Sequence, residues 1–226
     1  MTKILIIGAG SGGISAAARL RHRNKNYEIT LVDPSKFHYY QPLWTLVGGG
    51  AAKKEATCRP MKKVIPEGVS WVPEAVQAFQ PDTNHVTLVN GTRLSYDYLI
   101  VCPGIQINWN KIEGLPEALG KGGVCSNYSY DSVDSTWEAI RNTKKGNALF
   151  TYPNTPIKCG GAPQKIMYLA ENYFRNKGVR NSINVEFVSA GENMFAVKKY
   201  RDALDKVVAN LENRGSHPQA STRCSQ

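Results

Sequence analysis

The sequence predicts an α/β fold in which a Rossmann-like dinucleotide-binding domain is followed by an incomplete second domain of the same type. Three observations predict this fold. An apolar strand runs directly into Gly8-x-Gly10-x-x-Gly13 and a helix, and an acidic residue, Asp33, ends the next strand. A second strand–helix–strand run lies between residues 147 and 189. Alternating strands and helices are typical of a parallel sheet covered by helices.

The first elements form a βαβ unit. Residues 3–7 (Lys-Ile-Leu-Ile-Ile) are apolar enough for a buried parallel strand. A helix is expected at residues 12–23 and a second strand at residues 27–32. Residues 35–66, with three consecutive glycines, are expected as a loop. Further strands, two of them joined by an Asn90-Gly91 turn, are expected at 69–72, 75–80, 85–89 and 97–102, before a linker-like stretch at 105–123.

The second half repeats the alternation. A helix at residues 131–143 is expected to begin at Asp131 or Ser132. The remaining elements are a strand at 147–152, a helix at 163–176, a strand at 183–189 and a helix at 197–211. These assignments predict a first domain at 1–115, a partial second domain at 116–211 with only two central strands, and a disordered tail at 212–226.

Composition excludes several protein classes. The chain has 226 residues, of which 42% are hydrophobic and 20% charged, so it is neither intrinsically disordered nor fibrous. No apolar run is long enough to predict a membrane-spanning helix. The chain enters a strand directly after Met1-Thr2, so we expect either no leader or a leader missing from this sequence.

The chain is basic, with 28 Lys and Arg against 18 Asp and Glu and a net charge of +10. This balance favours anionic partners such as nucleotide cofactors. The basic residues are scattered and no nucleic-acid motif is present, so no nucleic-acid partner is expected. Five cysteines without a Cys-x-x-Cys pattern, and histidines far apart, predict no metal site and favour reactive thiols over a disulfide scaffold.

The glycine motif predicts a phosphate-binding turn. Gly8 permits the tight turn, Gly10 lets the backbone approach a pyrophosphate, and Gly13 lets the helix pack closely on the strand. Ser11 and Gly12 lie where the free N–H groups at the start of the helix point. Asp33 can accept hydrogen bonds from an adenosine ribose and would repel a 2′-phosphate, which argues against NADP. The motif leaves the choice between NAD and FAD open, and a purely structural turn is the alternative.

Two other stretches lie near the expected cofactor. The aromatic loop from Phe37 to Pro42 can lie along a cofactor or simply pack. The strand that ends in Cys102-Pro103-Gly104 offers a second nucleotide contact, with Cys102 itself read as a small buried apolar residue.

The loop from Thr155 to Pro163 carries the strongest candidate for chemistry. Cys159 lies beside Lys158 and just before a helix whose first turn contains Pro163, so the thiolate is favoured. The loop lacks a second Gly-x-Gly-x-x-Gly pattern, so no NAD is expected in the second domain. An inert loop cysteine is the alternative. Cys125 is a weaker second candidate, for which an inert role is favoured.

Five strings together resemble the sulfide:quinone oxidoreductases, in particular the branch that includes the mitochondrial enzymes. The resemblance covers about residues 3–210 and is most specific in the last string. The strings are Gly10 to Ile14, His38 to Pro42 with Thr45 to Gly48, Tyr98 to Ile100 with Gly104 to Gln106, Ser126 to Ser129, and Pro153 to Leu169.

The resemblance implies a flavoprotein with two dinucleotide-binding domains and one FAD. Such enzymes oxidise hydrogen sulfide to sulfane sulfur, pass electrons through FAD to a membrane quinone, and give the sulfur to a thiol or sulfite. It implies Ser11 and Gly12 at the diphosphate, Asp33 at the ribose, and Val76 at the adenine. Gln41 and Pro42 would lie beside the flavin. Cys159 would be the flavin-facing redox cysteine, and Cys125 matches a further cysteine in some relatives.

The departures from the family limit this reading. Cys102-Pro103-Gly104 replaces a commoner Ala-Thr-Gly, and the resemblance stops near Leu211. The second redox cysteine, the quinone pocket and the membrane-binding end are missing, so we expect a truncated form, the N-terminal half, with little or no activity. Its membrane is expected to be bacterial or the mitochondrial inner membrane. The alternatives are a type II NADH:quinone oxidoreductase-like enzyme and an inactive FAD-binding fragment.

Overall fold

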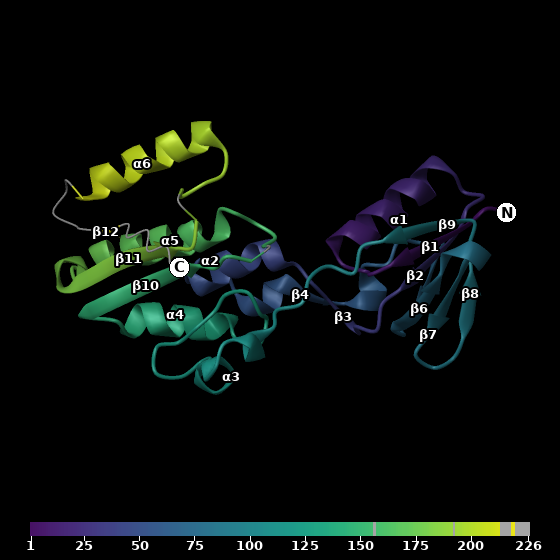
Figure 1. Cartoon of the computed structure of the whole chain (residues 1–226), viewed down its shortest axis with the longest axis horizontal. Helices are drawn as coiled ribbons and strands as arrows, with labels where there is room; N and C mark the ends of the chain where they lie inside the picture. The colour runs from purple at the N-terminus through teal and green to yellow at the C-terminus, as the bar shows by residue number, and fades with distance from the viewer. Residues whose placement is uncertain (156, 192, 213–217, 220–226) are drawn as a thin grey trace. The chain divides into compact units, whose positions relative to one another are not determined.

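The structure is a computed structural model that describes residues 1–155, 157–191, 193–212 and 218–219 (Figure 1). The chain divides into two compact units. Unit 1 comprises Met1–Gln41 and Glu55–Glu113, and unit 2 comprises Pro42–Lys54 and Gly114–Gln226. Both units are α/β, which confirms the predicted fold class.

Unit 1 is built on a four-stranded sheet in the order β5-β2-β1-β9, with every neighbouring pair parallel. The strands are β1 (Lys3–Ile7), β2 (Glu28–Val32), β5 (Val69–Val72) and β9 (Tyr98–Val101). β1 lies in the middle and four of its five residues are buried, as its unbroken apolar sequence predicts.

The two faces of this sheet are covered differently. Helix α1 (Ser11–Arg23) packs on one face, where Ile6, Ala17 and Leu31 share a buried cluster. An antiparallel sheet covers the other face, where Leu5, Val86 and Leu88 pack together (Figure 1). Its strands are β6 (Val76–Gln80), β7 (His85–Leu88) and β8 (Arg93–Ser95). The alternation along β1 thus directs its side chains into two separate cores.

Residues 35–66 are more structured than the predicted loop. β3 (Phe37–Tyr39) pairs antiparallel with β4 (Cys58–Pro60) in unit 1. Between them, α2 (Trp44–Gly48) belongs to unit 2 rather than to the first domain, where the sequence placed it. The reason is packing, because the Cβ position of Gly49 approaches Leu169 of α5 and that of Gly50 approaches Trp137 of α4.

Unit 2 contains a parallel sheet in the order β10-β11-β12. β10 (Gly146–Tyr152) and β11 (Ile183–Ser189) were predicted, but β12 (Pro218–Gln219) was not, so the expectation of only two central strands was wrong. β12 is two residues long and pairs through its backbone, which composition does not reveal. The rest of the predicted disordered tail, from residue 213 on, lies outside the described residues.

The helices of unit 2 are α3 (Leu115–Ala118), α4 (Val133–Asn142), α5 (Ala162–Asn176) and α6 (Lys198–Glu212). α5 carries much of the core, with Ile166, Ala170 and Phe174 buried in one cluster with Val185 of β11. A buried ion pair joins α5 to the segment before β11, since Arg180 Nε lies 3.3 Å from Glu171 Oε1.

Short 3-10 helices connect these elements. They are η1 (Gln41–Leu43), η2 (Lys54–Thr57), η3 (Met61–Lys63), η4 (Pro81–Thr83), η5 (Trp109–Lys111) and η6 (Arg180–Ser182). Within the described residues, no helix combines the length and apolar character needed to cross a bilayer.

Candidate functional site

The glycine turn of unit 1 is closed on one side by direct backbone contact. A Cβ atom on Gly13 would lie 1.8 Å from the Gly8 carbonyl oxygen. A Cβ atom on Gly8 would lie 2.3 Å from the carbonyl oxygen of Cys102, and Gly8 has a φ of +95°. Glycine is therefore required at both positions, which brings the ends of β1 and β9 and the start of α1 together.

The other side of the turn is open. No described atom lies within 4 Å of a Cβ built on Gly10, and both Ser11 and Gly12 are exposed. α1 begins here with Gly10 as its N-cap and no side-chain cap. The first N–H groups of a helix have no partner inside it and carry positive potential, so they can bind a phosphate group. The turn therefore fits the diphosphate of a dinucleotide such as FAD.

Asp33 organises this turn from the end of β2. Its Oδ2 atom accepts a hydrogen bond from the Ala9 N–H at 2.7 Å, and its Oδ1 atom accepts one from the Ser35 N–H at 2.8 Å. The Trp71 indole N–H donates to the Asp33 carbonyl at 3.0 Å. A carboxylate oxygen has two acceptor sites, so Asp33 can still accept from a ribose hydroxyl. The sequence missed its second role as a support for the turn.

Cys102, the first residue after β9, contacts the turn. The Cys102 sulfur is 3.7 Å from the Gly8 carbonyl oxygen, and burial raises the pKa of this thiol. Cys102 packs against the buried cluster that contains Ile6, Ala17 and Leu31, as the sequence suggested for a small apolar residue. Gly104 is exposed with a φ of +79°, a conformation that favours glycine.

The other predicted cofactor contacts are dispersed over the chain. Val76 begins β6 and is half-buried, with its backbone paired to Leu88. Gln41 is the last residue of the first segment of unit 1, and the exposed Pro42 is the first residue of unit 2. Their roles at the cofactor stay predictions.

Cys159 lies in unit 2, in the loop between β10 and α5. The residue is exposed, and the Ala162 N–H donates to its carbonyl oxygen at 3.2 Å. A Cβ at the next position, Gly160, would lie 3.6 Å from the Phe195 ring and 3.9 Å from the Tyr152 hydroxyl, which are ordinary van der Waals distances. A thiol that is accessible and close to the start of a helix is suited to nucleophilic chemistry.

Tyr128 is a neighbour of Cys159 that the sequence did not single out. Burial raises the pKa of its phenol to about 12, with further contributions from the charges of Cys159 and Tyr152. Within the described part of the chain, its buried hydroxyl has no hydrogen-bond partner. The only sequence signal was its place in the Ser126–Ser129 string.

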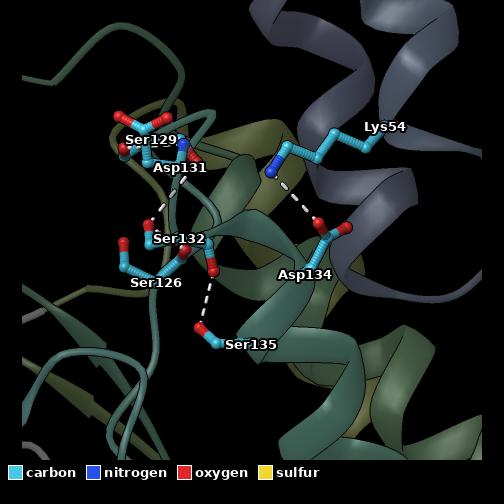
Figure 2. Close-up of polar contacts among 7 residues, drawn as sticks. All are labelled: Lys54, Ser126, Ser129, Asp131, Ser132, Asp134 and Ser135. Carbon is cyan, nitrogen blue, oxygen red and sulfur yellow. Dashed lines mark hydrogen bonds and ion pairs between the residues drawn. The ribbon is translucent and has the colours of Figure 1, made fainter.

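A serine network holds the segment that carries Tyr128 (Figure 2). The Ser132 hydroxyl donates to the Ser126 carbonyl at 2.8 Å, so this predicted helix cap holds the preceding loop instead of the first turn of α4. The Tyr128 N–H donates to the Ser126 hydroxyl at 3.2 Å. Lys54, the first residue of η2, pairs with Asp134 of α4 at 3.1 Å.

Cys125, next to this network, is half-buried. Burial raises the pKa of its thiol. A thiol that is mostly protonated is a weaker nucleophile. Cys58, Cys102, Cys125 and Cys159 are all free, and the described residues contain no cluster suited to a metal ion.

Comparison with known proteins begins with a family model. Residues 2–144 match the model of the pyridine nucleotide-disulphide oxidoreductases. This region includes the whole glycine turn and Asp33.

Individual relatives are more specific. The chain is 49% identical over 209 residues to the mitochondrial sulfide:quinone oxidoreductase of Dictyostelium discoideum, a match that covers 92% of this chain and 46% of that protein. It is 47% identical over 206 residues to the mouse mitochondrial enzyme, with 91% and 46% covered. The chain thus spans about half the length of the curated relatives it matches, and the predicted resemblance is confirmed.

A solved structure agrees on the fold. The sulfide:quinone oxidoreductase of the hyperthermophilic bacterium Aquifex aeolicus superposes with a TM-score of 0.76 at 19% identity. The superposition covers 97% of this chain and 51% of that one.

Proposed function

Since the chain belongs to the pyridine nucleotide-disulphide oxidoreductase family, we propose that it forms part of an FAD-dependent enzyme that oxidises hydrogen sulfide and reduces a quinone. The single observation that carries the proposal is the accessible Cys159 thiol in a loop that lacks a nicotinamide-binding glycine pattern. The loop composition favours sulfur chemistry over the NADH oxidation of a type II NADH:quinone oxidoreductase.

The glycine turn would hold the FAD. In the proposal, the N–H groups of Gly10, Ser11 and Gly12 bind the diphosphate and Asp33 accepts from the ribose. Gly8 and Gly13 allow the approach, while Gly104, Val76, Gln41 and Pro42 make the remaining contacts expected from the resemblance. When bound, FAD supplies a two-electron carrier between sulfide and quinone.

Cys159 would act on sulfur as the thiolate. The oxidation of sulfide to sulfane sulfur releases two electrons, and a quinone that takes up two electrons and two protons becomes a quinol. The sulfur then leaves to an acceptor thiol or sulfite. Cys125 is a secondary candidate whose burial disfavours the reactive thiolate. We also propose that the boundary between the two domains lies near residue 115 of the sequence. The protein is further proposed to work at the mitochondrial inner membrane.

The relatives' names support the location. Three relatives at 39–49% identity are described as mitochondrial, whereas the sulfide-quinone reductase of the bacterium Aquifex aeolicus is 23% identical. We propose a quinone pocket for the whole protein because its relatives are named as enzymes that act on a quinone, and a membrane contact because quinones dissolve in the membrane.

The test is the anaerobic reduction of FAD by sulfide. It is measured as the loss of the absorbance of oxidised flavin near 450 nm. We expect sulfide to reduce the bound flavin slowly and once, without sustained turnover, in keeping with the little or no activity expected from the sequence. Cys159→Ser should abolish even this reduction while FAD stays bound. Cys58→Ser is the matched control. Equal bleaching in wild type and Cys159→Ser would refute the role of Cys159. Bleaching by NADH, with none by sulfide, would favour the rival enzyme.

A further inference from the structure

Three backbone groups of Gly8 and Ala9, in the glycine turn, are each held by a different partner. The Gly8 N–H donates to the Val32 carbonyl at 2.9 Å, and the Ala9 N–H donates to Asp33 Oδ2 at 2.7 Å. The Ala9 carbonyl lies 3.2 Å from His38 Nδ1. The last contact comes from a residue 29 positions away, on β3.

The acceptor in this contact determines where the proton lies. A carbonyl oxygen can only accept a hydrogen bond, so His38 Nδ1 must carry a hydrogen and donate it. His38 is half-buried, which protects this bond from competition with water.

The same contact sets the direction of the next N–H group. The chain contains no cis peptide bond among its described residues. In a trans peptide, the carbonyl and the following N–H point in opposite directions. When His38 holds the Ala9 carbonyl, the Gly10 N–H therefore points away from His38. Gly10 is also the residue whose Cβ position is free of protein atoms.

The backbone fixes His38 in place for this contact. β3 pairs with β4 so that His38 lies opposite Arg59. Just before β3, the Ser35 hydroxyl donates to the Phe37 carbonyl at 2.6 Å, and the Ser35 N–H donates to Asp33. Asp33 thus supports both the turn and the segment that brings His38 to it.

We propose that His38 is a positioning residue for the cofactor: its Nδ1–H holds the Ala9–Gly10 peptide so that the Gly10 N–H faces the diphosphate. The inference rests on the proposed function, because it concerns how this turn is prepared for FAD. An ordered donor costs less conformational entropy on binding, so the contact raises affinity although His38 itself need not touch the cofactor.

The test compares the FAD affinity of wild type, His38→Gln, His38→Asn and one control variant. Affinity is measured by the quenching of flavin fluorescence. Asparagine can place an amide N–H near the position of Nδ1, whereas glutamine extends past it. We expect His38→Gln to weaken FAD binding by about five- to tenfold and His38→Asn to remain within about twofold of wild type. The control is His85→Gln, because His85 Nδ1 also contacts a backbone carbonyl, that of Thr83, but in the β6–β7 connection.

Two measurements separate positioning from folding. Thermal unfolding without FAD should be alike in His38→Gln and His38→Asn, while their FAD affinities differ. In the wild type, the amide resonance of Gly10 should shift when FAD binds. Equal affinity of wild type and His38→Gln would overturn the role of His38 alone. A Gly10 resonance that does not move at saturation would overturn the proposed contact of the Gly10 N–H with the diphosphate, and the role of His38 with it. A wild-type protein with no saturable FAD binding would instead overturn the proposed function, and the role of His38 with it.

Discussion

The glycine turn of unit 1 and the cysteine loop of unit 2 both join a parallel strand to a helix, yet they are built in opposite ways. In the turn, the groups available to a ligand are backbone N–H groups. Gly8 and Gly13 allow the close backbone packing of the turn, and Asp33 accepts a hydrogen bond from it. In the loop, the available group is the exposed thiol of Cys159, and the neighbouring Gly160 leaves room beside it.

This difference fits the proposed division of roles, with cofactor binding in the turn and sulfur chemistry in the loop. A binding turn gains from backbone order, because the cost of ordering its donors is met during folding. A nucleophile gains from access to its reaction partner, and Cys159 is exposed just before the start of α5. Substitutions in the turn should therefore act on stability and affinity, and substitutions around the loop should act on reactivity.

The largest effect is expected for Gly13→Ala, which tests the closed side of the turn. Its Cβ would lie 1.8 Å from the backbone oxygen of Gly8, and backbone cannot give way as a flexible side chain can. We expect a loss of about 3 kcal/mol or more in unfolding free energy, measured by urea denaturation. Gly10→Ala is the control, since its Cβ meets no protein atom and should change stability by less than about 0.5 kcal/mol. Similar losses of stability in both variants would contradict the distinction between a closed side of the turn at Gly13 and an open side at Gly10.

The second effect concerns the buried ion pair of α5, the helix that follows the cysteine loop. Glu171 on α5 is buried and accepts from Arg180 at 3.3 Å and from Arg175 at 2.5 Å. Glu171→Gln would leave the buried guanidinium of Arg180 without its counter-charge, and we expect a loss of about 2 kcal/mol in urea denaturation. Glu138→Gln is the matched control, because the Glu138–Arg141 pair is exposed and should contribute less than about 0.5 kcal/mol. Equal losses would show that the buried pair is no more important than the exposed one.

The third effect is on thiol reactivity. Cys159 is exposed, whereas burial raises the pKa of Cys102 and of Cys125. With limiting iodoacetamide near pH 8, we expect Cys159 to be alkylated at least about ten times faster than Cys125. Peptide mass spectrometry over time measures each rate, and Cys159→Ser should remove the fastest phase. If Cys125 were modified first, the assignment of the reactive thiol would have to move to it.

The smallest effect is on alkaline stability and sharpens the role of Tyr128. Its pKa rises from the ordinary 10.0 to about 12 on folding, so the folded state keeps a proton that the unfolded state has already released. Its contribution to stability is intact below pH 10 and is lost as pH rises from 10 towards 12. After allowance for partial exposure, we expect Tyr128→Phe to reduce this loss by about 1 kcal/mol.

The matched control for Tyr128 is Tyr98→Phe in unit 1, a tyrosine that is 65% exposed. Unfolding free energies at pH 9 and pH 11 give the comparison. An alkaline loss that is the same in wild type and in Tyr128→Phe would show that the buried phenol does not control it.

Local patterns made the βαβ unit and the glycine turn predictable from sequence. The apolar run at β1 and the spacing of Gly8, Gly10 and Gly13 lie within a few residues of each other, so they signal both the fold and the turn. The loop with Cys159 was equally visible, because it combines glycines, a lysine and a proline before an apolar helix.

The missed features depend on contacts between distant residues. The packing of α2 in unit 2 comes from Gly49 against Leu169, and the support of the turn by His38 joins positions 29 residues apart. Neither leaves a periodic pattern in the sequence. The two-residue strand β12 is defined by backbone pairing alone, which side-chain composition does not encode.

The central claim is that the open side of the Gly8–Gly13 turn binds the diphosphate of FAD. An equilibrium titration of FAD with wild type and with Gly10→Ala tests it most directly, because the added methyl group occupies only the space assigned to the cofactor. We expect saturable binding to wild type and at least about tenfold weaker binding to Gly10→Ala, which corresponds to about 1.4 kcal/mol, with unchanged thermal unfolding. Equal affinity of the two proteins would contradict the claim.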